Sequence, residues 1–455
     1  MPATWKLTTT VLLTAAFSIL ILLHTPGIDG PWYSHAGWHH APALEIWTMM
    51  LLCALPMGAA IFLHDRFKRT RIALALIMFS VVGFTLTSVT HLANQFSWQP
   101  MVRSIQNPVS ISYFADAAIL MNAPGTVGDW LRQYPQLSPQ MFLHSQNKPP
   151  GPVLYYALFI HFFGVTDRAA LLAGMALACI ISLAVPATHW LARVLGASTS
   201  SAFYAAVALA LTPSLNLFFP SFDAAYMIAT CGLLGLWALA MKHDRAAASL
   251  AFGAVLALAT FIAYHLLALG ALIVALGWTL PPPARRIRTF VNHSGIALAT
   301  FIGLYFVFWL FVGFNPIATV SIAMQNAAHL ASNWYRPYPW TILFDLTGIL
   351  LGAGWIGALL AVFYLFNGED LRRDVVRLGL LQVVLVPVTG LLPGETERVC
   401  AFLIPLLAIP AGAELARWKP LPRYAALACT FIILVLLAQN LTQTYGTKAP
   451  LVMPR

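Results

Sequence analysis

The segment HSQNKPPGPVLYYALFIHFFG, residues 144–164, joins a polar stretch to an apolar run and sets the topology of everything that follows it. As an α-helix its apolar part, 150–164, would be about 22 Å long at 1.5 Å per residue, whereas the hydrocarbon core of a bilayer is about 30 Å thick. We therefore predict a juxtamembrane or half-inserted helix here, on the outer face of a membrane, and another at 108–121. If 150–164 crossed the membrane, every later basic loop would change sides.

The rest of the chain is too apolar for a soluble protein. Of its 455 residues, 60% are hydrophobic and 9% are charged, and the mean hydropathy is +0.77. Apolar runs of about 20 residues recur along it, as they do in polytopic membrane proteins. Because backbone polar groups inside a bilayer must pair within the protein, the spanning elements are predicted to be helices. We predict an all-α transmembrane bundle of about 13 spanning helices, at 8–24, 43–63, 73–92, 169–190, 199–213, 223–241, 247–263, 265–281, 289–313, 341–366, 375–391, 399–416 and 424–440.

Basic residues predict the orientation of these helices. Seventeen of the 25 Lys and Arg residues fall in loops that this topology puts on one side, which leaves eight for the other. Since cytoplasmic loops carry the excess of positive charge, we expect the first helix to start inside and the last to end outside. The net charge of +10 is then explained by the basic residues of the loops that determine the orientation of the helices. We therefore expect no nucleic-acid partner. Three regions follow: an amino-terminal three-helix segment at 1–92, an extracytoplasmic loop with juxtamembrane helices at 93–168, and a transmembrane bundle at 169–455.

Charged and aromatic side chains gather between residues 113 and 152. Tyr113-Phe-Ala-Asp116 opens this polar island and His144-Ser-Gln-Asn-Lys148 closes it, ahead of two prolines. A carboxylate at bilayer depth costs about 2.5–3.5 kcal/mol on insertion scales, so a polar cluster beside membrane helices is a functional candidate. Proline is tolerated in the first turn of a helix and keeps the preceding residue extended. Lys148 would therefore stand at a helix start that favours an anion. The predicted outer face also collects Asp223, Asp345, Glu395 and Arg398.

The order of these motifs resembles that of the GT-C superfamily of membrane glycosyltransferases, which includes protein O-mannosyltransferases and the lipid A aminoarabinose transferases. The matching stretches are Asp116 with Gly128-Asp129-Trp130 and 144–151, then 212–223, 336–345, and 394–398 ahead of Ile404-Pro405. The resemblance covers residues 105–410. The long loop follows the third helix here instead of the first, so 1–92 contains an extension of two helices. Ala117 follows Asp116 where the better-known members have a second acid.

The resemblance implies inverting transfer of a sugar from a polyprenyl-phosphate donor to a glycan, lipid or protein acceptor. It places the active site on the extracytoplasmic side of a multi-pass protein of the cell (inner) membrane. Such a reaction needs a base for the acceptor hydroxyl and positive charge against the leaving phosphate. We assign the base to Asp116 and the phosphate contacts to Lys148 and Arg398. The predicted substrate-binding set is completed by His144, Asp223, Asp345 and Glu395. No metal ligand is predicted and no cofactor is certain, although a divalent cation stays open.

Several candidates also have a purely structural interpretation. Asp116 could cap a helix, and Lys148 could extend along apolar surface to the membrane interface. Arg398 could simply pair with Glu395 three residues earlier, and an acid such as Asp223 suits the start of a helix. The aromatic residues before Asp345 could form an interfacial belt; they are Trp334, Tyr335, Tyr338 and Trp340.

The alternative function is a polytopic transporter or lipid flippase without glycosyl transfer. That function predicts broken helices and charges near their middles, which most of the predicted spans lack. A histidine-rich patch at His35, His39 and His40 makes zinc binding conceivable, but adjacent histidines on a short loop rarely share one metal.

Overall fold

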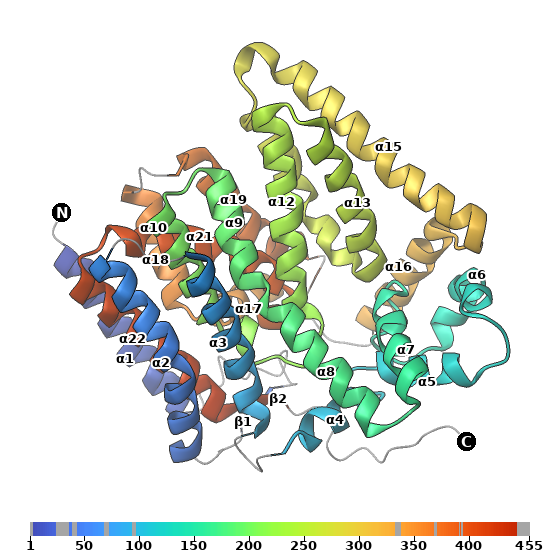
Figure 1. Cartoon of the computed structure of the whole chain (residues 1–455), viewed down its shortest axis with the longest axis horizontal. Helices are drawn as coiled ribbons and strands as arrows, with labels where there is room; N and C mark the ends of the chain where they lie inside the picture. Colours follow the sequence, from blue (N-terminus) through green and yellow to red (C-terminus); the bar gives the residue numbers. More distant parts are fainter. Residues whose placement is uncertain are drawn as a thin grey trace.

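The computed structural model describes residues 3–23, 36–38, 43–67, 72–92, 97–332, 338–367, 371–390, 392 and 395–443. Within these ranges the chain is almost wholly helical, and its two short strands, β1 (Ala36–Trp38) and β2 (Leu441–Gln443), pair antiparallel. Figure 1 shows an elongated bundle with α1 (Ala3–Leu22), α2 (Ala43–Phe67) and α22 (Pro420–Asn440) side by side at one end. Toward the other end lie α13 (Ala246–Ile262) and α15 (Arg286–Val312).

The remaining elements complete the chain order. The first half contains α3 (Ile72–Leu92), α4 (Gln99–Gln106), α5 (Tyr113–Asn122), α6 (Val127–Leu137), η1 (Ser138–Gln140), α7 (Gly151–Phe163), α8 (Asp167–Ser182), α9 (Ala184–Leu195), α10 (Thr199–Ala210), α11 (Pro213–Asn216), η2 (Asp223–Ala225) and α12 (Tyr226–His243). The second half contains η3 (Tyr264–Leu269), α14 (Gly270–Thr279), η4 (Pro283–Arg285), α16 (Pro316–Ser332), α17 (Trp340–Gly352), α18 (Ile356–Asn367), α19 (Arg373–Thr389), α20 (Thr396–Val399), η5 (Ala401–Leu403) and α21 (Ile404–Arg417).

The chain is a multi-pass helical membrane protein, but the predicted count of 13 spans is not confirmed. Seven helical stretches in the described residues are long and apolar enough to cross a membrane: 4–22, 44–67, 72–89, 167–195, 223–243, 283–312 and 420–440. An eighth would be α17 and α18 taken together, which the sequence predicted as one span at 341–366. These two helices meet at a bend of 97°, because Gly354 and Trp355 between them adopt left-handed backbone conformations, with φ of 79° and 48°.

The other five predicted spans form shorter helices. The helices α10, α13, α14, α19 and α21 have 12, 17, 10, 17 and 14 residues. As predicted, 150–164 is also short: α7 has 13 residues, or about 20 Å of helix. One helix, α16, was missed. It has 17 residues, and its polar side chains, among them Gln325, Asn326 and His329, hide it from a search for apolar runs.

The tightest packing in the core joins α10 to α21. The buried face of α10 is rich in alanine, including Ala202, Ala205 and Ala206, none of which is exposed. Gly412 of α21 lies directly against this face: a Cβ at Gly412 would be 2.1 Å from the backbone nitrogen of Ala205. Small residues let membrane helices approach closely where larger side chains would hold them apart.

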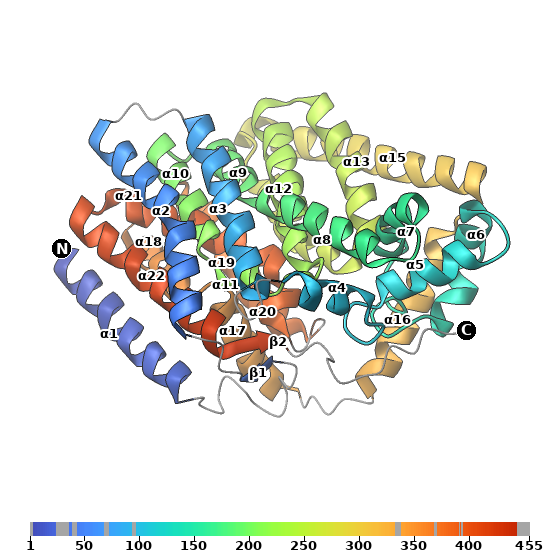
Figure 2. The ribbon, with the colours of Figure 1, turned by 60° about the horizontal axis from the view of Figure 1, so that its bottom comes forward.

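Two buried polar networks tie the amino-terminal helices to the carboxy-terminal ones. The ammonium of Lys6 on α1 pairs with the buried carboxylate of Glu414 on α21. On α2, Asp65 accepts hydrogen bonds from Arg423 on α22 and from the hydroxyl of Tyr204 on α10, each at 2.5 Å. The helices α1 and α2 are therefore packed into the bundle, as the views in Figures 1 and 2 show.

We predict that Gly412→Ala destabilises the protein. The new methyl group would meet backbone atoms of α10 that no rotamer change can move, and such overpacking costs about 1–3 kcal/mol. The thermal unfolding midpoint of the purified protein should fall by several degrees. Gly58→Ala is the matched control, since a Cβ at Gly58 meets nothing within 4 Å. Equal midpoints for the two variants would contradict the close approach of α10 and α21.

Candidate functional site

Asp116 lies one turn into α5, inside the polar island. The helix begins after Ser112, so Asp116 is not its capping residue. The Asp116 side chain is buried and accepts a hydrogen bond from the backbone N–H of Phe142, 3.3 Å from Oδ2. Burial raises the pKa of the Asp116 carboxyl to about 6, and the hydroxyl of Ser145 and the N–H of Phe142 partly oppose this rise. The carboxylate thus joins the two ends of the polar island and ionises near neutral pH.

Ser112 fixes how those two ends meet. It is fully buried and adopts a positive φ of 65°, a conformation that costs a non-glycine residue energy and clusters at functional sites. Its hydroxyl donates to the carbonyl of Pro108 at 2.7 Å and accepts from the backbone N–H of His144 at 3.1 Å. The carbonyl of Ser112 also accepts a hydrogen bond from the N–H of Asp116. Ser112 therefore fixes the position of the His144 backbone relative to that of Asp116.

Lys148 makes contacts through both its backbone and the end of its side chain. Its carbonyl accepts a hydrogen bond from the hydroxyl of Tyr134 at 2.8 Å, and its Nζ lies 3.5 Å from Nδ1 of His265. Burial lowers the pKa of Lys148, while the carboxylate of Asp223 opposes this effect. Next along the chain, Gly151 starts α7 against 261–262, where a Cβ would be 2.5 Å from a backbone oxygen. The ammonium of Lys148 therefore points toward His265 inside the bundle. The side chain does not simply extend to the membrane interface.

Arg398 on α20 forms the most highly connected ion pair of the site. Its guanidinium lies 3.1 Å from the carboxylate of Asp223 and also pairs with Glu395 three residues earlier. The local pair with Glu395 was predicted, and the pair with Asp223, 175 positions away in sequence, shows that Asp223 does more than start a helix. Ser221 also donates to Asp223, at 3.0 Å. All three charged side chains are largely buried.

The short helix α20 reaches this position through two glycines on α17. Gly348 and Gly352 lie one turn apart and face α20: a Cβ at Gly348 would be 2.4 Å from Oγ1 of Thr396, and one at Gly352 would be 2.7 Å from the carbonyl oxygen of Glu397. The hydroxyl of Thr396 donates to the carbonyl of Asp345 at 2.7 Å. Asp345 is thereby placed beside α20, and its side chain is buried.

Glu397, which the sequence analysis did not select, also belongs to this region. It is buried, and its carbonyl accepts from the hydroxyl of Ser214 at 2.5 Å. Burial, and then the neighbouring carboxylate of Glu395, raises the pKa of Glu397 to about 7. The signal in the sequence is the run Glu395-Thr-Glu-Arg398, which contains Glu397 next to two predicted site residues.

Five of the seven predicted residues form one group, Asp345 lies beside α20, and Asp116 is a separate carboxylate. Burial and then the charge of Arg398 lower the pKa of His144 to about 4; Glu395, Lys148 and Asp223 act on the same imidazole. These five side chains therefore lie within electrostatic range of one another. Asp116 stands apart from them. The phenol of Tyr113 interacts with Asp223 and Arg398 as well as with Asp116, so it lies between the two parts.

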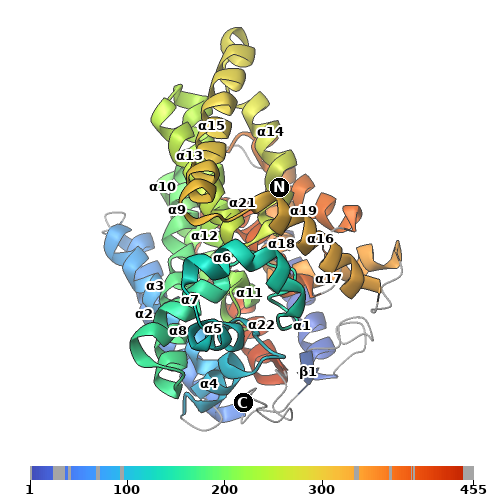
Figure 3. The ribbon, with the colours of Figure 1, turned by 90° about the vertical axis from the view of Figure 1, so that its right-hand side faces the viewer.

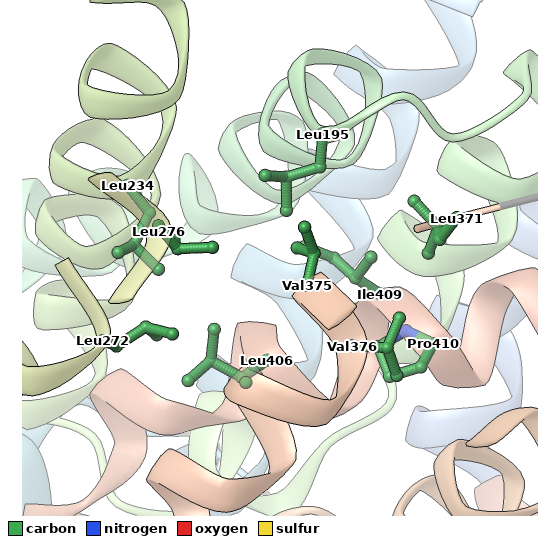
Figure 4. Close-up of a pocket in the computed structure, with 11 residues that line it drawn as sticks. Leu195, Leu234, Leu272, Leu276, Leu371, Val375, Val376, Leu406, Ile409 and Pro410 are labelled. Atoms are coloured by element: carbon green, nitrogen blue, oxygen red, sulfur yellow. The ribbon is translucent and has the colours of Figure 1, made fainter. Parts of the chain in front are cut away.

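Figure 3 shows the helices that carry this arrangement, with α4 to α8 grouped together and α16 beside α6. The α16 helix contacts the loop before α7, where Asn326 donates to the carbonyl of Gln146 at 2.7 Å. A small pocket of about 30 Å³ elsewhere in the bundle is lined by aliphatic side chains from α9, α12, α14, α19 and α21 (Figure 4). It contains none of the predicted site residues.

Some predicted features lie outside the described residues or cannot be placed with the site. Trp334, Tyr335 and the three histidines His35, His39 and His40 fall outside the described ranges. Tyr338 and Trp340 are exposed, as an interfacial belt requires. In the part of the chain that the structure describes, no three His, Cys, Asp or Glu side chains are placed to hold a metal ion.

No family model and no curated protein matches the chain. Among solved structures, ArnT from Cupriavidus metallidurans bound to undecaprenyl phosphate is similar with a TM-score of 0.49 and 16% identity, over 76% of this chain and 60% of that one. An oligosaccharyltransferase from Archaeoglobus fulgidus in complex with zinc and sulfate is similar with a TM-score of 0.43 and 14% identity, over 80% of this chain and 53% of that one. The chain thus spans less than two thirds of either protein.

We predict that Gly352→Ala displaces α20 from α17. The Cβ would overlap the hydroxyl of Ser214 and the carbonyl of Glu397, so Cys400 at the end of α20, which is fully buried, should become reactive toward a maleimide. Labelling measured by peptide mass spectrometry should rise about tenfold if the cost is about 1.4 kcal/mol. Gly357→Ala, where a Cβ meets nothing within 4 Å, should leave Cys400 protected. Unchanged labelling in Gly352→Ala would show that α20 does not depend on this contact.

Proposed function

We propose that this protein is a GT-C-type membrane glycosyltransferase. It would move a sugar from a polyprenyl-phosphate donor to a glycan, lipid or protein acceptor, with inversion at the anomeric carbon. The observation that carries the proposal is the placement of a buried carboxylate, Asp116, near but apart from the cations of Lys148 and the largely buried Arg398. Buried charges beside membrane helices are costly and mark functional sites.

The proposed reaction exchanges one bond for another. The acceptor oxygen bonds to the anomeric carbon while its proton passes to the carboxylate of Asp116. The bond between the anomeric carbon and the donor phosphate oxygen breaks, and its electron pair stays on the phosphate. With a pKa of about 6, Asp116 is largely ionised at pH 7 and is basic enough to act as a general base.

Positive charge is what the leaving phosphate needs. Lys148 supplies a point charge, and Arg398 supplies a planar set of N–H donors that suits phosphate oxygens. Asp223 and Glu395 fix the orientation of the guanidinium of Arg398. Preoriented donors of this kind stabilise charge that develops in a transition state, because they need not reorganise during the reaction.

We infer the side of the membrane on which the site lies from the charge distribution. Basic residues predicted inside, such as Lys6, Arg417 and Arg423, join networks with Glu414 and Asp65. None of these networks contains a predicted site residue. The positive-inside rule would put them at the cytoplasmic face. We therefore place Asp116 and Arg398 at the extracytoplasmic face of an inner membrane.

Deletion of the gene followed by lipid mass spectrometry of membrane extracts tests the function. A polyprenyl-phosphate-linked sugar should accumulate; wild type should clear it, and Asp116→Asn, which removes the base but keeps the shape, should not. General bases contribute about 10²–10⁴-fold to rate. Asp374→Asn, at an exposed acid that pairs with Arg372, should behave as wild type. If lipid-linked sugars are unchanged and a solute or lipid is instead mislocalised, the protein is a transporter or flippase.

The pH dependence of turnover tests the role of Asp116 separately. Since only the ionised carboxylate accepts a proton, turnover should rise with pH through about 6 and level off above it. The pKa of Glu397 is raised to about 7 and that of His144 is lowered to about 4, so Glu397 is the residue that the experiment must separate from Asp116. Glu397→Gln should keep the limb near pH 6. A limb that moves away from 6 in Glu397→Gln would assign it to Glu397 instead of Asp116.

A further inference from the structure

His265 lies beside the proposed phosphate site but was not selected by the sequence analysis. It belongs to the short η3 segment between α13 and α14 and is 8% exposed. Its ring lies edge-on to that of Tyr226, with centroids 4.6 Å apart, and near that of Phe402 at 5.4 Å. Its Nδ1 is 3.5 Å from the ammonium of Lys148. The imidazole thus connects an aromatic wall to a residue of the site.

The contact with Lys148 assigns the proton on this imidazole. An ammonium can only donate, so Nδ1 of His265 must accept, and the ring proton then sits on Nε2. Nε2 is buried and has no hydrogen-bond partner among the residues that the structure describes. The hydroxyl of the neighbouring Tyr226 is buried and, within the same described ranges, also has no partner. Leaving a buried donor unsatisfied costs about 1–3 kcal/mol, so these two donors on neighbouring rings are suited to bind a ligand that accepts hydrogen bonds.

The surroundings of these two donors indicate what that ligand is. His265 interacts electrostatically with Lys148, Asp223 and Arg398, and Tyr226 interacts with Asp223 and Arg398. Both donors therefore border the pair of cations. A ligand that accepts hydrogen bonds and suits two cationic side chains is an oxyanion, and phosphate is the one that the proposed reaction supplies.

We propose that Nε2–H of His265 and the hydroxyl of Tyr226 donate hydrogen bonds to oxygens of the donor phosphate. This inference rests on the proposed function. When the bond to the anomeric carbon breaks, the phosphate changes from a singly charged diester to a monoester that carries one more negative charge. Arg398 is already paired with two acids, so much of this added charge falls to Lys148 and to the two neutral donors. Donors that bind the product more strongly than the substrate assist the step.

Binding of undecaprenyl phosphate to the full-length protein in nanodiscs tests the inference, with undecaprenol as the probe that has the same tail and no phosphate. Tyr226→Phe removes only the hydroxyl, and His265→Phe keeps a ring against Tyr226 and Phe402. Each variant should bind undecaprenyl phosphate about tenfold more weakly than wild type, as expected for one hydrogen bond to a charged group, and undecaprenol equally well. Tyr305→Phe is the control, since its hydroxyl contacts Thr260 and the carbonyl of Ala257, away from the charged group.

The outcomes separate this inference from the function on which it rests. If wild type prefers undecaprenyl phosphate and the two variants keep that preference within twofold, the donor role of His265 and Tyr226 is wrong while the function stands. Equal weakening for both probes would mean that the variants disturb packing, and it would also overturn the donor role. If wild type itself does not distinguish the two probes, the proposed function fails together with this inference.

Discussion

The ion pair between Arg398 and Asp223, with Glu395 on the other side of the guanidinium, determines how the rest of the site is arranged. It joins η2, just before α12, to α20, two segments that are far apart in sequence. Such a buried pair gives little net stability, because removing charges from water costs about as much as their attraction returns. Its presence in the bundle is therefore better explained by what it positions than by what it stabilises. The glycines of α17 serve the same end, since they let α20 come close enough for the pair to form.

The site combines ionised groups with neutral ones, and burial is the reason. Where water is excluded, each charge must be paired, so Arg398 is matched by two acids, and burial keeps His144 neutral at pH 7. Asp116 stands outside this charged group and is solvated mainly by backbone and hydroxyl groups of its own loop. In this arrangement the proposed base and the proposed phosphate site do not neutralise each other, as direct contact between Asp116 and Lys148 would cause.

Hydropathy and charge predicted the membrane class, the position of most helices and the short length of α7, because these depend on local composition. They did not predict the bend between α17 and α18, which depends on two left-handed residues, or the polar helix α16. Within the site, the sequence pointed to Glu395 and Arg398 through their spacing. Glu397, His265 and Tyr226 could not be found in this way. Each of them matters through neighbours from other helices, and an isolated His or Tyr in an apolar run has no distinguishing local signal.

The links between the two ends of the chain have a consequence for how the protein is made. Lys6 and Glu414 are 408 positions apart, and Asp65 and Arg423 are 358 apart. At about 5–20 residues per second of synthesis, roughly 20–80 s separate the insertion of α1 from the appearance of its partner. During that time the first two helices wait in the bilayer with their charged ends unmatched. The bundle is therefore closed only when its last helices leave the ribosome, and a chain interrupted before α21 would expose the ends of α1 and α2 to quality control.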